Sequence, residues 1–223
     1  MGDAIGQMLP AAVGVALSPL PIVAVVLMLV SRRGRTSGPA FVLGWILGLA
    51  VVGAIVLSAA GGAGASDDGN PATGVSVLKL VLGALLLFVA ARQWRGRPRD
   101  PEQVETPKWM GALDTFTPAK AAGTGALLSG VNPKNTLLAV AGAGAIAGTG
   151  IDTGQQIVAY ALFVLIATIG VGAPVVLAIV MGDRSRKLLD ELKDWMAANN
   201  AVIMAVLLLL LGVKLIGDGI SGL

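Results

Sequence analysis

Long apolar stretches constrain the fold of this chain more than any other feature of its sequence. A helix needs about 20 consecutive apolar residues to cross a hydrocarbon core roughly 30 Å thick. Six stretches reach that length, and short polar segments separate them. Their approximate ranges are 5–30, 38–61, 74–94, 120–148, 155–182 and 199–220. The sequence therefore predicts an all-α, polytopic membrane protein with six transmembrane helices.

The composition supports this fold class and excludes several kinds of chemistry. Hydrophobic residues make up 55% of the chain and charged residues only 13%, about half the charge of an ordinary soluble domain. The chain has no Cys and no His, the usual ligands of soft metals and haem, so we expect no cofactor and no such metal. The net charge of +3 sits in short loops between apolar stretches, so we expect no nucleic-acid partner.

The basic residues predict which loops face the cytoplasm. The loops after the first, third and fifth stretches are basic, and those after the second and fourth hold acidic residues and no Lys or Arg. The basic residues are Arg32, Arg33 and Arg35; Arg95, Arg97, Arg99 and Lys108; and Arg184, Arg186, Lys187 and Lys193. Because basic loops stay in the cytoplasm, we expect a multi-pass protein of the bacterial plasma membrane with both termini outside.

Two of the cytoplasmic loops contain apolar residues at helical spacing among charges. They are Trp109, Met110, Leu113 and Phe116 in one loop, and Leu188, Leu189, Leu192, Trp195 and Met196 in the other. This spacing predicts a short amphipathic helix on the inner leaflet in each loop. Such a helix could be a passive anchor, a gate, or a surface that recruits envelope-assembly proteins.

Three spans per half would place the second half upside down relative to the first, an architecture found in many secondary transporters. The predicted halves are residues 1–94 and 120–223, joined by a cytoplasmic linker at 95–119. The pattern G-x-x-L-S followed by helix breakers occurs at 14–21 and again at 125–135. A Leu-Gly pair also recurs, at 82–83 and 211–212, though this match is weak in so Leu-rich a sequence. These matches predict a 3+3 inverted repeat.

The helix breakers predict that the first and fourth transmembrane helices are discontinuous. Proline removes a backbone donor and frees carbonyls that lipid cannot satisfy, so a broken segment must face protein or a wet cavity. Paired broken segments are the best sequence indication of a transport site, although prolines can also simply kink helices for packing. The predicted substrate-binding residues are Ser18, Pro19, Pro21, Ser129, Asn132, Pro133, Lys134 and Asn135.

Lys134 is the strongest single candidate among these residues. An ammonium within a span costs a few kcal/mol, so it should face the bundle interior beside an acceptor or an anionic ligand. No carboxylate lies within the membrane core of any predicted span, so the charge would suit an anionic or zwitterionic substrate group. Alternatively, the side chain extends along its stem to the inner interface.

Several stretches carry a family resemblance: ALSPLPIV (16–23), GPAFVLGWILGL (38–49), LGALLLFVAARQWRGRP (82–98), ETPKWMGALDTFTPAKAAGTGALLSGVNPKN (105–135) and LDELKDWMAANNAVIMAVLLLLLGVKLIGDGI (189–220). They resemble the actinobacterial GAP family, the peptidoglycolipid and sulfolipid addressing proteins of the LysE exporter superfamily. Asn132-Pro133-Lys134 resembles the NPK motif of LysE-type exporters. The resemblance implies a six-span exporter whose relatives are linked to placing glycolipids in the mycobacterial envelope.

We therefore expect a secondary exporter that moves a glycolipid, a lipid-linked solute or a small polar or zwitterionic substrate toward the envelope by alternating access. The alternatives are an amino-acid exporter and a non-transporting scaffold for envelope lipid assembly. An enzyme is not expected, because the membrane core offers only Ser18, Ser129, Thr168 and Lys134 as reactive groups. Gly44 and Gly48 form a G-x-x-x-G pattern that suits helix packing or a homodimer.

Overall fold

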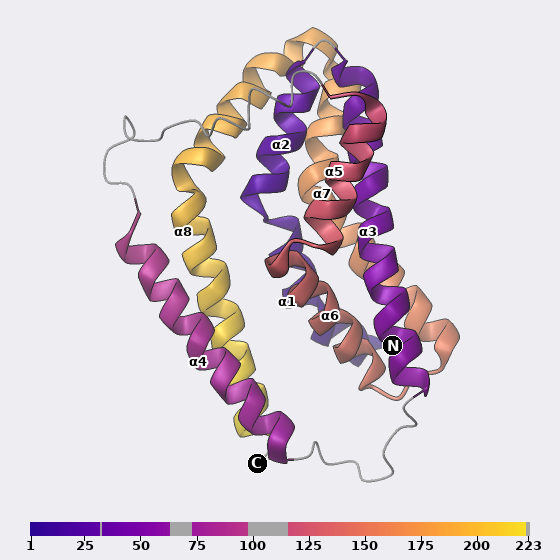
Figure 1. Cartoon of the computed structure of the whole chain (residues 1–223), viewed down its shortest axis with the longest axis vertical. Helices are drawn as coiled ribbons and strands as arrows, with labels where there is room; N and C mark the ends of the chain where they lie inside the picture. The colour runs from indigo at the N-terminus through magenta and orange to yellow at the C-terminus, as the bar shows by residue number, and fades with distance from the viewer. Residues whose placement is uncertain (32, 63–72, 98–115, 222–223) are drawn as a thin grey trace. The chain divides into compact units, whose positions relative to one another are not determined.

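The computed structural model describes residues 1–31, 33–62, 73–97 and 116–221, and all regular secondary structure in them is helical (Figure 1). The elements are α1 Gly2–Ala16, α2 Pro19–Val30, α3 Gly34–Gly62, α4 Thr73–Arg95, α5 Pro118–Gly130, α6 Pro133–Ala147, α7 Thr153–Met181, the 3-10 turn η3 Gly182–Arg184, and α8 Ser185–Ile220. The predicted all-α class is confirmed.

Several of the helices have the length and surface of membrane spans. Among the described residues, α3, α7 and α8 are long and apolar enough to cross a bilayer, and α1 with α2, bent by 49°, makes up to four. The outer face of α3 shows why: Leu43, Leu47, Val51 and Ile55 recur at helical spacing and are each more than half exposed. An apolar stripe of this kind suits lipid rather than water, which supports a multi-pass membrane protein.

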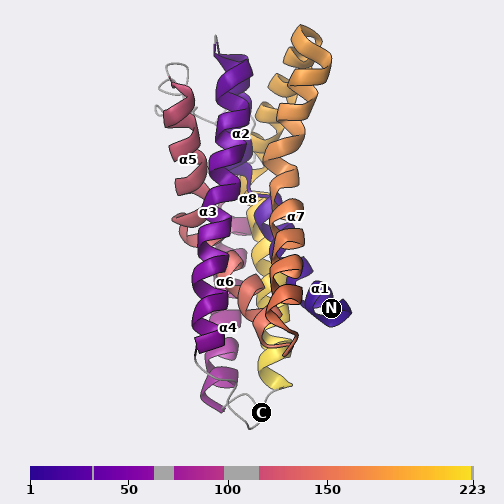
Figure 2. The same cartoon turned by 90° about the vertical axis from the view of Figure 1, so that its right-hand side faces the viewer.

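The described helices form two compact units, and each is considered by itself. The first, unit 1, comprises residues 1–64 and 105–197, and therefore holds α1, α2, α3, α5, α6, α7 and the first turns of α8. Within it, α5 lies along α3 (Figure 2), while α1 contacts α6 and α7. Both compact units combine segments of the two predicted sequence halves.

Small residues explain the close packing of α3 on α5. A Cβ added to Gly44 would overlap the Ala122 carbonyl, and one added to Gly125 would overlap the Phe41 carbonyl. Glycine lets two helix backbones approach until they touch. The G-x-x-x-G pattern therefore packs within the chain, and its face is not available to a second copy.

The second unit, unit 2, comprises residues 65–104 and 198–223, so it pairs α4 with the C-terminal part of α8. Gly83 and Gly212 lie at the contact: a Cβ added to Gly212 would stand 3.0 Å from the Gly83 carbonyl oxygen. These are the glycines of the two Leu-Gly pairs. The weak sequence match thus corresponds to a real contact between α4 and α8.

The predicted short amphipathic helix at 188–196 is wrong as a separate element, because α8 runs unbroken from Ser185 to Ile220. The reason is that residues 183–211 contain neither Gly nor Pro, so the change from polar to apolar sequence does not end the helix. Of the five apolar residues predicted to form one face, Leu189 and Met196 are buried, whereas Leu188 and Trp195 are exposed. Residues 109–113 of the other predicted loop helix lie outside the described residues.

Candidate functional site

The first helix break lies between α1 and α2. Ser18 precedes α2 in an extended conformation (φ −76°, ψ 108°), and Pro19 and Pro21 lie in the first turn of α2. Proline has no N–H, and its ring disfavours a helical conformation in the preceding residue, which favours an end of α1 before Ser18. The Ser18 hydroxyl makes no capping bond to its own helix and is therefore available to another element.

The second helix break lies between α5 and α6. Asn132 caps α6, and its side-chain oxygen accepts a hydrogen bond from the Lys134 backbone N–H at 3.2 Å. Pro133 follows as the first residue of α6. The Thr136 hydroxyl donates to the carbonyls of Gly130 and Asn132, both at 2.9 Å, and so satisfies the Gly130 carbonyl, which the break frees. The helix is therefore interrupted at both predicted places, and of these two pairs α1 with α2 qualifies as a broken membrane span among the described residues.

The two breaks meet through a chain of side-chain hydrogen bonds. The Ser18 hydroxyl donates to Asn135 Oδ1 at 2.7 Å, and Lys134 Nζ donates to Ser18 Oγ at 2.9 Å. Asn135 Nδ2 in turn donates to the Leu128 carbonyl at 2.9 Å. Ser18 and Asn135 are 3% and 1% exposed. We call Ser18, Lys134 and Asn135 the helix-break cluster.

Lys134 carries the only charge of the cluster. In the part of the chain that the structure describes, the lysines that form ion pairs are Lys187, Lys193 and Lys214, and Lys134 has no carboxylate partner. An ammonium has three N–H donors, and Ser18 takes one of them. A partly buried cation with donors to spare suits an anionic group, which would supply charge and acceptors together.

The remaining predicted site residues do not join this polar chain. Ser129 is fully buried, and its hydroxyl donates to the Ala126 carbonyl of its own helix at 3.2 Å. It packs where a Cβ on Gly48 would lie, so it belongs to the α3–α5 contact. Asn132 and Pro133 shape the start of α6, and Pro19 and Pro21 shape the start of α2.

One residue at the first break was not among the predicted site residues. A Cβ added to Gly170 of α7 would overlap the carbonyl of Ala16, the last residue of α1. Glycine at this position therefore lets α7 pack directly against the break. The available signal was a glycine in an apolar helix, which more often reflects packing than a site.

Comparison with known families identifies the chain. The profile of the family described as "Sap, sulfolipid-1-addressing protein" matches residues 8–221, which include both helix breaks and the whole helix-break cluster. Searches of curated proteins and of solved structures found no significant match. Because the family profile covers almost the entire sequence, the chain belongs to the sulfolipid-1-addressing protein family.

Proposed function

We propose that this chain is a non-enzymatic membrane transporter that moves a lipid or lipid-linked substrate across the bacterial plasma membrane toward the cell envelope. The observation that carries the proposal is the helix-break cluster, in which Lys134 and Asn135 of one broken helix bond Ser18 at the other break. The family description, which refers to addressing of a sulfolipid, supports a lipid as the transported molecule.

We propose further that the chain has six spans arranged as a 3+3 inverted repeat, with both termini outside. In such a repeat a pseudo-twofold axis relates the first span to the fourth and the third to the sixth, and residues near the axis contact their counterparts. The contact between the two breaks and the contact between Gly83 and Gly212 both fit this relation. They support it independently, because each lies within a different compact unit.

The chemistry of the cluster suggests how transport would proceed. An anionic substrate group would accept hydrogen bonds from Lys134 and compete with Ser18 for its ammonium. The Lys134–Ser18 bond is one of two that join the breaks, the other being Ser18–Asn135, so its loss would weaken the link and ease a movement of α2 and α6 about them. Interrupted backbone hydrogen bonding makes such breaks natural hinges. The substrate's charge would thereby be coupled to the movement that exposes the site to the other side.

The absence of a carboxylate from the cluster favours an anionic substrate over a zwitterionic one. An amino acid would present an ammonium as well as a carboxylate, and the cluster offers that ammonium only the oxygens of Ser18 and Asn135. Export of amino acids by a LysE-type mechanism is therefore the second candidate. A scaffold for envelope lipid assembly is the third, based on the amphipathic residues at the start of α8.

The deciding experiment compares cells that lack the gene with cells complemented by wild type, Lys134→Ala or Lys214→Ala. Lys214 is the matched control, because it is a lysine of an apolar helix but is paired with Asp218 at 2.6 Å. Surface-extractable lipids, total lipids and intracellular amino acids are quantified in each strain by mass spectrometry. Immunoblots of membrane fractions establish equal protein levels.

We expect a surface lipid to be lost without the gene and restored by wild type and Lys214→Ala, but not by Lys134→Ala. An amino acid that accumulates in cells lacking the gene, with normal surface lipids, would favour the second candidate. Full restoration of the surface lipid by Lys134→Ala would show that the charge of the helix-break cluster is not needed for function. It would favour the third candidate, a scaffold for envelope lipid assembly.

A further inference from the structure

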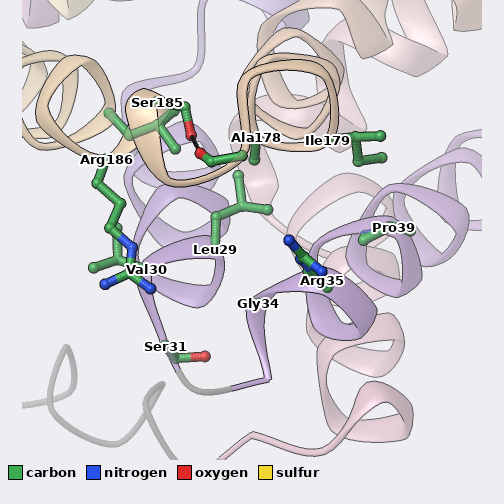
Figure 3. Close-up of a pocket in the computed structure, with 12 residues that line it drawn as sticks. Leu29, Val30, Ser31, Gly34, Arg35, Pro39, Ala178, Ile179, Ser185 and Arg186 are labelled. Carbon is green, nitrogen blue, oxygen red and sulfur yellow. Dashed lines mark hydrogen bonds between the residues drawn. The ribbon is translucent and has the colours of Figure 1, made fainter.

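A cavity of about 390 Å³ lies at one end of unit 1, remote from the helix-break cluster. It is enclosed by the end of α2, the start of α3, the end of α7 and the start of α8 (Figure 3). Leu29, the first α2 residue that lines it, follows Ser18 by 11 positions, which corresponds to about 17 Å at 1.5 Å per residue. Its volume falls in the range of ligand pockets, about 300–1,000 Å³.

Two arginines line this cavity. Arg35 is the second residue of α3 and Arg186 the second residue of α8, and in Figure 3 their side chains lie on either side of Leu29. Neither helix has an acidic residue in its first turn. A helix N-terminus carries partial positive charge and normally favours an anionic neighbour. Arg35 and Arg186 add positive charge at the N-termini of α3 and α8, and both line one cavity. The electrostatic potential in the cavity therefore favours an anion.

Apolar side chains also line the cavity, although more of its accessible lining is polar than apolar. Leu29 and Val30 of α2, Ile179 of α7 and Leu189 of α8 line it. Its two serine hydroxyls donate within their own turns, Ser31 to Met28 and Ser185 to Gly182, both at 2.7 Å. Hydrogen bonds to a bound anion would therefore come from the guanidinium groups. The apolar side chains can contact the apolar part of a ligand whose anionic group lies at the arginines.

The basic loops at this end are those predicted to face the cytoplasm, where anionic lipids of the inner leaflet attract basic residues. We propose that the cavity binds the phosphate headgroup of an anionic phospholipid from the inner leaflet. Arg35 and Arg186 donate hydrogen bonds to the phosphate, and Leu29 and Ile179 contact the adjoining glycerol and acyl carbons. The bound lipid ties the α2–α3 connection to the α7–α8 connection. This site is separate from the helix-break cluster and does not depend on transport.

The test measures thermal unfolding of the purified full chain in a neutral detergent with three additives: phosphatidylglycerol, phosphatidylcholine and inorganic phosphate. Binding to the folded state raises the midpoint temperature by an amount that grows with the logarithm of the ligand concentration once that concentration exceeds the Kd. We expect phosphatidylglycerol to raise the midpoint in this way, and phosphatidylcholine and inorganic phosphate to leave it within error. This comparison uses the wild-type protein alone.

Variants then locate the site. Arg35→Gln and Arg186→Gln are each expected to raise about tenfold the phosphatidylglycerol concentration that gives a set midpoint shift, the loss of one charge-assisted contact. Arg33→Gln is the matched control, because Arg33 is an exposed residue that precedes α3 and does not line the cavity. We expect it to change that concentration by less than about twofold.

Three results would overturn the proposal. Equal stabilisation by phosphatidylcholine would show an apolar groove without headgroup recognition. Equal stabilisation by inorganic phosphate would show a free-anion site. An equal loss of affinity in Arg33→Gln would show diffuse surface attraction rather than a site. Should the arginine variants fail to fold, the wild-type comparison of the three additives still decides between these cases.

Discussion

Ser18→Ala should destabilise the protein far more than Ser129→Ala, although the two serines occupy matching positions in the repeated G-x-x-L-S pattern. Ser18 is 3% exposed and bonds both Asn135 Oδ1 and Lys134 Nζ. Hydrogen bonds between membrane helices are worth about 0.6 kcal/mol on average and about 1.7 at most. A bond to a charged group is stronger, about 1.5–3 kcal/mol. Removing both should therefore cost about 2–4 kcal/mol.

Ser129→Ala should cost less than about 1 kcal/mol, because its hydroxyl only bonds back to the Ala126 carbonyl of its own helix. The measurement is reversible unfolding of both variants in mixed micelles with increasing dodecyl sulfate, monitored by tryptophan fluorescence. The double variant Ser18→Ala/Asn135→Ala should be less destabilised than the sum of its single variants, since they share one bond. Equal costs for the two serine variants would refute the cluster as described.

Further substitutions test the packing of each unit in the same unfolding assay. Gly44→Ala should cost at least about 2 kcal/mol, because the new Cβ would overlap backbone that cannot move aside. Gly123→Ala is the control: its Cβ would meet open space, so it should be neutral or stabilising by up to about 1 kcal/mol. Tyr160→Phe should cost about 1 kcal/mol through loss of its 2.8 Å bond to the Leu49 carbonyl. An unchanged free energy of unfolding would show that this bond does not stabilise the protein. Gly212→Ala should cost about 1–2 kcal/mol by separating α8 from α4, and an unchanged midpoint would contradict that contact.

The helices and their breaks could be predicted because they depend on local properties. Apolar length decides which segments can span a bilayer, and Pro19 and Pro133 mark places where a new helix begins. Proline alone does not fix a break, because Pro10 and Pro174 lie inside α1 and α7. The continuation of α8 through residues 185–199 does not follow from the sequence pattern, because the change of polarity near residue 199 does not mark a helix end. Backbone hydrogen bonding continues across such a change wherever no Gly or Pro intervenes.

The membership of the site could be predicted only in part, because it depends on contacts between distant residues. The repeated pattern gave Ser18 and Ser129 equal weight, but Gly48 of α3 occupies the space beside Ser129, while α6 faces Ser18. Nothing in the local sequence distinguishes these environments. The same applies to Gly170, whose role follows from its contact with the end of α1.

The start of α2 has a consequence for how the protein is made. A ribosome completes α1 and α2 long before it reaches Lys134 and Asn135, so the first break must enter the bilayer without its partners. Two of the first three residues of α2 are proline and bring no N–H that lipid would leave unsatisfied, each such group costing several kcal/mol. Until α6 arrives, the Ser18 hydroxyl can bond a carbonyl of the preceding turn, as Ser31 bonds that of Met28. The prolines that interrupt the helix thus also reduce the number of N–H groups left unsatisfied when the first break enters the bilayer.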